Sequence, residues 1–220
     1  MARQTILSKN QRIILDLLSR EEQFTRHFYL TGGTALAEFY LHHRYSEDLD
    51  FFSEEEVDPT LLFPLLKKIG GKAGIKKIET SQSFNRNLFF LHLKDEIIKT
   101  EFTYFPFPRI EHKGRYEKLA IDSLLDIAVN KVFTIYQNPR SRDFIDLYCI
   151  LEKEDWTIAE LIKKAKIKFD WHVDPPQLGS QFLQATVLKD YPRMIKKIKP
   201  AVWQNFFLAE AKKLQKKIFE

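Results

Sequence analysis

The chain has 220 residues and a net charge of +5; 44% of its residues are hydrophobic and 30% are charged, which favours a buried core and excludes a disordered or collagen-like chain. Its single cysteine, Cys149, is expected in the core and excludes both a disulfide framework and a cysteine-built metal cluster. No run of about 18 apolar residues predicts a membrane span, and the N-terminus turns polar too early for a secretory signal, so we expect a cytoplasmic protein.

The first half of the chain is predicted to mix helices and strands. Apolar residues at helical spacing predict helices over residues 8–20, 35–41 and 61–69. Ser8 and Thr34 can cap the first two helices, and Gly70-Gly71 is expected to end the third. Extended apolar runs predict strands over residues 28–31, 49–52, 87–93 and 97–105, with the last two forming an antiparallel hairpin.

Beyond Tyr116 the pattern is helical throughout. We expect helices over residues 121–136, 143–151, 157–168, 177–188 and 202–219. The chain therefore divides into an α/β N-terminal half and an all-helical C-terminal half, with a boundary near residues 108–118.

The first candidate site is a pair of carboxylates at the second predicted strand. Asp48 and Asp50 are two residues apart, so they project from one face of an extended chain, with Leu49 and Phe51 on the buried face. Two neighbouring carboxylates repel unless they are neutralised, and their oxygens suit Mg²⁺ or Mn²⁺. The alternative is a solvated strand end with two exposed acids.

Two further features favour a metal and phosphate site. Gly32-Gly33-Thr34 forms a turn between a strand and a helix about fifteen residues before the acid pair, and such a turn lets a phosphate approach the backbone. Glu101 lies inside an apolar strand and needs a partner or a site. If that strand adjoins the Asp48–Asp50 strand, three carboxylates can hold two metal ions; otherwise Glu101 faces solvent on an edge strand.

A second group of polar residues lies in the helical half. Lys131 interrupts a helix that is apolar nearly all round, so it either reaches out to solvent or serves a site, for example by contacting a phosphate. Asp143 and Asp146 share one face of the next helix. Asp146 can pair with Arg142, or one of the two aspartates can hold Lys131 in place; the spacing leaves both open.

Charge is unevenly distributed along the chain. Residues 1–60 carry 6 Lys and Arg against 11 Asp and Glu, whereas residues 161–220 carry 13 against 5. The basic end is compatible with a polyanion-binding surface or with a solvated helical face, and charge alone favours the second.

Three segments and one lysine together resemble a known family: GGTALAEFYLHHRYSEDLDFF, KTEFTYF, Lys131 and RDFIDLY. Over about residues 24–151 the chain is similar to the AbiEii/AbiGii-type nucleotidyltransferase toxins of abortive-infection and toxin–antitoxin systems. The resemblance implies the DNA polymerase β-like fold, an α+β class with a small mixed sheet flanked by helices and an all-helical C-terminal region. The implied domains are residues 1–115, the nucleotidyltransferase core, and 116–220, a helical domain that contributes to the active site.

The resemblance also implies an activity and roles for individual residues. A nucleotide would pass from an NTP to an acceptor with release of pyrophosphate; in some relatives the acceptor is the tRNA 3′ end. Metal ligands would be Asp48, Asp50 and, in the third position, Glu101. Nucleotide contacts would come from Gly32, Gly33, Thr34, Arg44, Ser46 and Lys131. The last essential acid would be Asp146, with Asp143 as the alternative.

The same residues leave other functions open. A protein that binds nucleotide or RNA on this fold without catalysis would use the basic C-terminal half, although clustered carboxylates disfavour that hypothesis. A phosphotransferase would release NDP instead of pyrophosphate. The resemblance implies NTP and Mg²⁺ or Mn²⁺ as substrate and cofactor, RNA such as tRNA as acceptor through the basic C-terminal region, and a cognate antitoxin as a possible partner.

Overall fold

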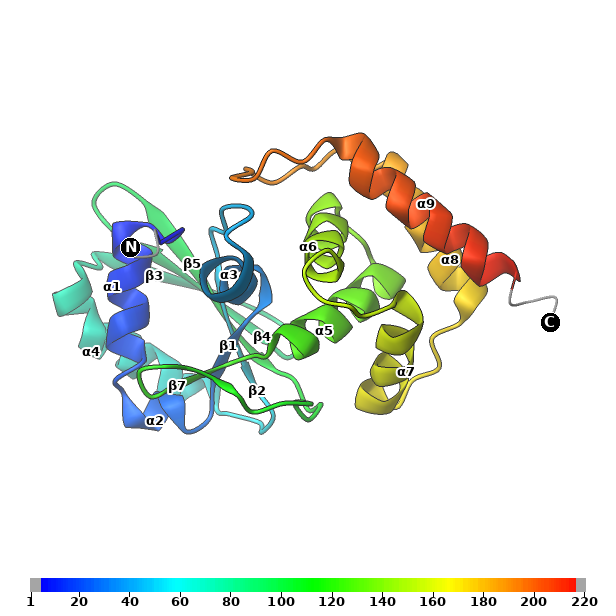
Figure 1. The fold of residues 1–220 in the computed structure, drawn as a ribbon. Helices are drawn as coiled ribbons and strands as arrows, with labels where there is room; N and C mark the ends of the chain where they lie inside the picture. Colours follow the sequence, from blue (N-terminus) through cyan, green and yellow to red (C-terminus); the bar gives the residue numbers. More distant parts are fainter. Residues whose placement is uncertain (1–4, 217–220) are drawn as a thin grey trace. The chain divides into compact units, whose positions relative to one another are not determined.

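A computed structural model describes residues 5–216 (Figure 1). The chain divides into two compact units. The sheet unit comprises residues 5–40 and 45–123, and the helical unit comprises residues 41–44 and 124–216. A four-residue segment that follows the first helices of the sheet unit thus belongs to the helical unit.

A seven-stranded mixed sheet forms the centre of the sheet unit, in the order β3-β4-β5-β2-β1-β7-β6. Parallel pairing joins β2 to β5 and β1 to β7, and the other neighbours are antiparallel. The strands are β1 (Tyr29–Thr31), β2 (Leu49–Ser53), β3 (Lys77–Ser83), β4 (Arg86–His92), β5 (Ile97–Tyr104), β6 (Gly114–Tyr116) and β7 (Leu119–Ile121). This mixed sheet with its helices confirms the predicted α+β fold class.

Aromatic and polar side chains alternate along the central strands, so the sheet has one buried aromatic face. Phe51 on β2 stacks on Phe102 of β5, with ring centroids 5.4 Å apart, and both are buried. Phe24 packs edge-on against both rings and comes from the short helix α2 (Glu22–Thr25). The opposite face of β2 and β5 therefore carries the residues between these, which include Asp50 and Glu101.

Helices α1 (Lys9–Leu18) and α4 (Leu62–Ala73) contact each other in the sheet unit. Ser8 caps α1 as predicted, in a capping box with Gln11. The predicted stop at Gly70-Gly71 is wrong, because α4 continues through both glycines and ends at Gly74, whose φ of +75° suits a helix terminus. The buried side chains of Leu66, Ile69 and Ala73 keep one apolar stripe across that stretch.

The helix after β1 begins earlier than predicted. α3 (Gly32–Ala35) starts at the first glycine and continues as a π-helical turn, η1 (Leu36–Leu41), so Thr34 lies inside the helix and does not cap it. A 3-10 turn, η2 (Pro59–Leu61), precedes α4.

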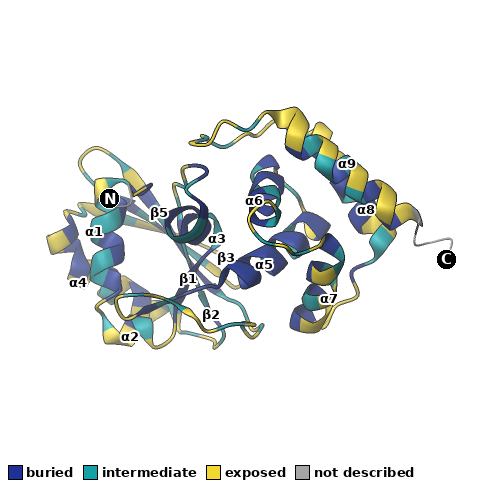
Figure 2. Ribbon diagram, in the orientation of Figure 1, coloured by how far each residue is buried: buried dark blue, intermediate teal, exposed yellow. Residues whose placement is uncertain are grey.

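The helical unit contains α5 (Leu124–Gln137), α6 (Ser141–Leu151), α7 (Ile158–Phe169), α8 (Pro175–Leu183), the 3-10 turn η3 (Gln184–Thr186) and α9 (Pro200–Lys216). All five predicted helices are present, and the predicted residues 217–219 lie outside the described range. The helical pattern predicted beyond Tyr116 is wrong at its start, because Leu119–Ile121 form strand β7 between β1 and β6, and α5 begins at Leu124 rather than 121. Phe182 of α8 packs against Phe207 of α9, and Trp203 of α9 packs against Phe144 of α6; all four are buried. Figure 2 shows α5 buried along most of its length, whereas α9 alternates buried and exposed residues.

No helix within residues 5–216 has both the length and the apolar character of a membrane span.

Candidate active site

The three predicted carboxylates lie on, or directly before, two adjacent strands of the sheet. Asp50 of β2 is the direct cross-strand partner of Glu101 of β5 in the parallel ladder. Asp48 precedes β2 by one residue. The strand of Glu101 therefore adjoins the strand of the aspartates, which is the arrangement that a site of three carboxylates requires.

The glycine turn closes directly over Asp50. Gly32 has a φ of +70°, and a Cβ atom placed on it would lie 2.5 Å from Asp50 Oδ2. A side chain at position 32 would therefore both strain the backbone and displace the carboxylate. Two residues further on, the Thr34 hydroxyl donates a hydrogen bond to the backbone carbonyl of Asp48. The turn and the acid pair form one packed structure.

Two basic residues pair with these acids. The Arg86 guanidinium on β4 donates to both carboxylate oxygens of Glu101, at 2.7 and 2.6 Å. Lys99 Nζ on β5 lies 2.9 Å from Asp48 Oδ2 and 4.0 Å from Glu101 Oε2. The Thr103 hydroxyl also donates to Glu101, at 2.9 Å. Neither basic residue follows from the sequence motifs, although Lys99 stands two positions before Glu101 and so shares its strand face.

Neighbouring charges on this face of the sheet shift the pKa values of Glu101 and Arg86. Burial raises the pKa of Glu101, but the hydrogen bonds and charge of Arg86, with the Thr103 hydroxyl and Lys99, outweigh burial and hold that pKa below its ordinary value. The hydrogen bonds to Glu101 raise the pKa of Arg86, and the nearby Asp50 and Asp48 add to this effect. Glu101 and Arg86 are thus both ionised at neutral pH.

The donor set fits a hard divalent cation in its chemistry. Asp48, Asp50 and Glu101 offer carboxylate oxygens, which Mg²⁺ and Mn²⁺ prefer. The Gly32 turn leaves room for the Asp50 carboxylate where a side chain would exclude it. Within residues 5–216, no three His, Cys, Asp or Glu side chains lie in an arrangement that could hold a metal ion. Asp48 and Glu101 contact the cations Lys99 and Arg86 instead.

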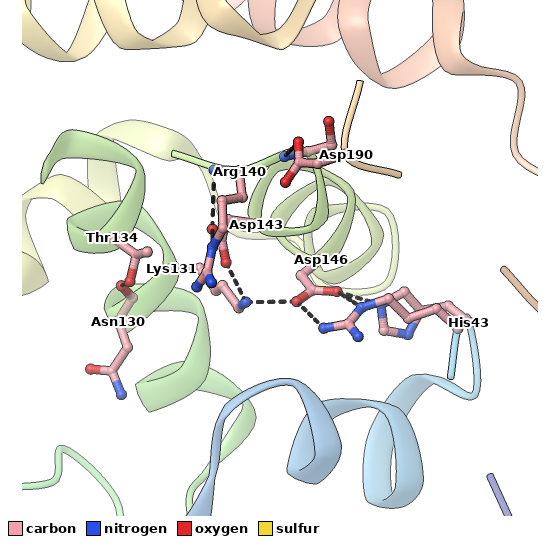
Figure 3. A network of polar contacts seen from close by, with 10 residues as sticks. His43, Asn130, Lys131, Thr134, Arg140, Asp143, Asp146 and Asp190 are labelled. Atoms are coloured by element: carbon pink, nitrogen blue, oxygen red, sulfur yellow. Dashed lines mark hydrogen bonds and ion pairs between the residues drawn. The ribbon is translucent and has the colours of Figure 1, made fainter. Parts of the chain in front are cut away.

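The predicted residues of the helical unit converge on Asp146 of α6 (Figure 3). Arg44 donates two hydrogen bonds to this carboxylate in a bidentate arrangement, with Nε 2.6 Å from Oδ1 and Nη2 2.8 Å from Oδ2. Nε2 of His43 lies 2.8 Å from Oδ1. Asp146 and His43 are completely buried. Arg44 is therefore fixed in the helical unit, and its predicted nucleotide contact stays a prediction. Ser46, in the sheet unit, accepts a hydrogen bond from Gln11 through its backbone carbonyl.

Lys131 of α5 binds both candidate aspartates. Its Nζ lies 2.7 Å from Asp143 Oδ1 and 2.7 Å from Asp146 Oδ2 (Figure 3). Asp143 also accepts a hydrogen bond from the backbone N–H of Arg140, so it fixes the start of α6. Of the two pairings that the spacing left open, the structure has the one with Lys131. The predicted phosphate contact of Lys131 and the catalytic role of Asp146 or Asp143 stay predictions.

Burial and the neighbouring charges shift the pKa of Asp146 in opposite directions. Burial raises the pKa of Asp146, but Arg44, Lys131 and His43 together hold that pKa well below its ordinary value. Burial lowers the pKa of His43 and outweighs the opposing effect of Asp146. His43 is neutral at pH 7 and donates from Nε2. Its participation is not visible in the sequence, where His42-His43 marks a helix end. Cys149 is a buried thiol as predicted, and burial raises its pKa to about 12.

Comparison with known proteins shows relatives of the same fold. JHP933 from Helicobacter pylori shares the fold, with 21% identity and a TM-score of 0.61 over 95% of this chain and 90% of that protein. A second H. pylori structure has 19% identity and a TM-score of 0.61 over 96% and 97% of the two chains. An uncharacterized protein of Aquifex aeolicus (strain VF5) is 33% identical over 144 residues, which are 64% of this chain and 66%, just under two thirds, of that protein.

A family model identifies the chain more closely. The model of the nucleotidyl transferase AbiEii toxin of type IV toxin–antitoxin systems matches residues 16–213. The chain belongs to this family of nucleotidyltransferase toxins, which confirms the resemblance seen in the sequence.

Proposed function

We propose that this protein is a metal-dependent nucleotidyltransferase that moves a nucleotide from an NTP to an RNA acceptor, such as the 3′ end of tRNA, and releases pyrophosphate. The observation that carries the proposal is the pairing of Asp50 with Glu101 on adjacent parallel strands, beside Asp48 and under the Gly32 turn. Membership of the AbiEii family supports the reaction class and a role as the toxin of a toxin–antitoxin system.

In this proposal the three carboxylates hold Mg²⁺ or Mn²⁺. A divalent ion bound there supplies positive charge for the transferred phosphate and lowers the pKa of the attacking hydroxyl. The residues of this chain would position the reactants: Gly32 leaves room for the Asp50 carboxylate, Thr34 holds the backbone of Asp48 in place, and the triphosphate would bind at the Gly32-Gly33 turn. The register of β2 and β5 fixes the spacing of Asp50 and Glu101.

The acceptor assignment rests on charge. Exposed lysines are spread over the helical unit, on α7, on α9 and on the segment between α8 and α9, among them Lys163, Lys196, Lys197, Lys212 and Lys213. Lysines that neutralise RNA phosphates release counterions, so binding to RNA should weaken steeply as salt rises. The proposal includes a cytoplasmic location, where NTPs and tRNA occur, and a cognate antitoxin as partner.

A label-transfer assay tests the proposal. Purified protein, Mg²⁺ and total RNA are incubated with each α-labelled NTP in turn, and wild type is compared with Asp50→Asn. We expect label on RNA and release of pyrophosphate with wild type, and loss of both with Asp50→Asn. Asp95→Asn is the matched control, because Asp95 is exposed at the β4–β5 turn, and it should behave as wild type.

The other outcomes separate the alternatives. Release of NDP would identify a phosphotransferase. Mg²⁺-dependent NTP binding without transfer of any of the four labels would identify a non-catalytic binding protein. Mass spectrometry of RNA from cells that express the protein would name both the added nucleotide and the acceptor.

A further inference from the structure

Two basic side chains share the sheet face of the carboxylates, and the proposed function gives them no role. Arg86 reaches across from β4 and binds both oxygens of Glu101. Lys99 lies on β5, binds Asp48 and stands 4.0 Å from Glu101. The two cations thus connect the acids of β2 and β5.

Arg86 is far more exposed than Glu101, the acid that it binds, whereas Lys99 and Asp48 are similarly exposed, at 29% and 28%. The side chain of Arg86 is 51% exposed and that of Lys99 is 29% exposed, whereas that of Glu101 is 7% exposed. Glu101 is also held from its own strand by Thr103, and Asp50 lies against Gly32. Glu101 and Asp50 are therefore fixed by the fold, while Arg86 binds Glu101 from the solvent-accessible side. Ion pairs between exposed side chains contribute little to stability, and the exposed charged groups of Arg86 and Lys99 keep contact with water.

Charge balance explains why cations are needed here. Three carboxylates on neighbouring strands repel one another, and Arg86 and Lys99 together supply two positive charges, as one divalent ion does. Each carboxylate oxygen has two lone pairs and can serve a metal and a hydrogen-bond donor together, but a divalent ion on Asp48 and Glu101 would stand a few ångström from the positive charges of Arg86 and Lys99, which repel it. The cations and the metal therefore compete for Asp48 and Glu101.

We propose that Arg86 and Lys99 are exchangeable counter-ions: they neutralise Glu101 and Asp48 in the metal-free protein, and they pass to the triphosphate when metal and nucleotide bind. This inference rests on the proposed function, since it assumes that the carboxylates ligate the metal. The ligand class is a polyphosphate anion, whatever its base. Guanidinium and ammonium groups suit it, because Arg binds phosphate oxygens in a bidentate manner and Lys acts as a point charge.

The first test measures binding of Mn²⁺ alone to the full chain, by the loss of the free-ion electron paramagnetic resonance signal. Arg86→Gln and Lys99→Gln should each bind Mn²⁺ more tightly than wild type, by about tenfold, because a competing positive charge a few ångström away has been removed. Arg86→Lys keeps the charge and should stay close to wild type. Lys77→Gln is the matched control, because Lys77 pairs with Glu79 on the edge strand β3 of the same sheet.

The second test measures binding of inorganic tripolyphosphate at saturating Mg²⁺. Arg86→Gln and Lys99→Gln should bind it more weakly by about tenfold, because each loses a cation that binds the anion. Opposite changes in the two affinities are the expected signature, since a merely structural role would weaken both.

Three results would overturn the inference. If the two glutamine variants bind Mn²⁺ no more tightly than wild type, the cations do not compete with metal. If they bind tripolyphosphate as wild type does, the cations do not pass to the phosphate. If wild type and variants alike bind no Mn²⁺, the metal assignment in the proposed function is wrong, and the inference fails with it. Loss of Mn²⁺ binding in Asp50→Asn separates this last case from the first two.

Discussion

The two units hold their acids in opposite ways. In the sheet unit, Asp48 and Glu101 pair with Lys99 and Arg86, whose side chains are 29% and 51% exposed. In the helical unit, Asp146 is completely buried and contacts three basic residues, which are Arg44, His43 and Lys131.

The difference follows from the cost of moving charge out of water. A buried carboxylate is tolerated when several partners satisfy its oxygens, and it becomes costly once a partner is removed. An acid whose partner is exposed can exchange that partner for another cation, because the released partner returns to water. The Asp146 network of the helical unit therefore stabilises the fold, whereas the acids of the sheet unit can bind a new ligand. Four predictions test this contrast.

Asp146→Ala should have the largest effect. Removal of this carboxylate leaves Arg44 and Lys131 with less compensation in the interior, and such a loss costs about 5 kcal/mol of unfolding free energy, at the upper end of the range for buried pairs. Urea unfolding followed by circular dichroism measures the loss. Asp155→Ala is the matched control: Asp155 is exposed in the same unit, and its loss should cost about 0.5 kcal/mol or less. Equal costs for the two variants would show that the Asp146 network does not stabilise the fold.

A second buried pair in the helical unit tests the same principle. Lys168 Nζ of α7 lies 2.7 Å from Asp126 Oδ1 of α5, and both side chains are completely buried. Lys168→Met leaves the charge of Asp126 with less compensation and should cost about 3 kcal/mol. The double variant Asp126→Leu/Lys168→Met removes both charges and should recover most of that loss. A double variant as unstable as Lys168→Met would mean that packing, and not charge, sets the cost.

The part of the candidate site that can be predicted from the sequence is the part that depends on neighbouring residues. Asp48 and Asp50 alternate with Leu49 and Phe51, so the strand and its acidic face can be predicted from a few neighbouring residues. The register of β2 against β5 joins residues that are far apart in the sequence. The position of Glu101 beside Asp50 can therefore be predicted only on the condition that the two strands are neighbours. The same holds for Arg44, which pairs with an aspartate 102 residues further along the chain.

Two of the mispredictions have physical reasons: strand β3 was missed, and α4 was predicted to end too early. β3 has the polar sequence KIETSQS and lies at the sheet edge, mostly exposed, so it lacks the apolar alternation that marks a half-buried strand. α4 passes through Gly70-Gly71, where glycine favours a stop but the buried stripe of Leu66, Ile69 and Ala73 favours continuation. Tertiary packing outweighs the local preference there.

Gly32→Ala probes the sheet unit directly. The left-handed backbone disfavours any side chain, and the new Cβ would contact Asp50 Oδ2, so we expect a loss of about 2 kcal/mol in unfolding free energy together with weaker Mn²⁺ binding. Gly71→Ala is the control of opposite sign, because an added Cβ there meets no described atom within 4 Å. It lies inside α4 and should stabilise the protein by about 0.5 to 1 kcal/mol. A Gly32→Ala protein with wild-type stability would contradict the close packing of the turn on Asp50.

His43 gives the smallest expected effect, which depends on pH. Burial holds its pKa below the ordinary value, and Nδ1 has no hydrogen-bond partner among the described residues, so protonation would bury an unsatisfied donor. Below about pH 6.5 the unfolded chain binds a proton that the folded chain refuses, so lowering the pH favours unfolding. Stability from this group is fully present above that pH and declines as the pH falls towards the pKa of the folded state.

The measurement compares urea unfolding at about pH 7.5 and about pH 5.5, where His43 should account for a loss of about 1 kcal/mol. His43→Gln replaces the imidazole Nε2 donor with an amide donor to Asp146 and removes the titrating group. The variant should therefore lose about 1 kcal/mol less than wild type between the two pH values, even if it is less stable at both. An identical pH dependence in the two proteins would show that His43 titrates alike in the folded and unfolded chains, and that burial of the Asp146 network does not exclude the proton.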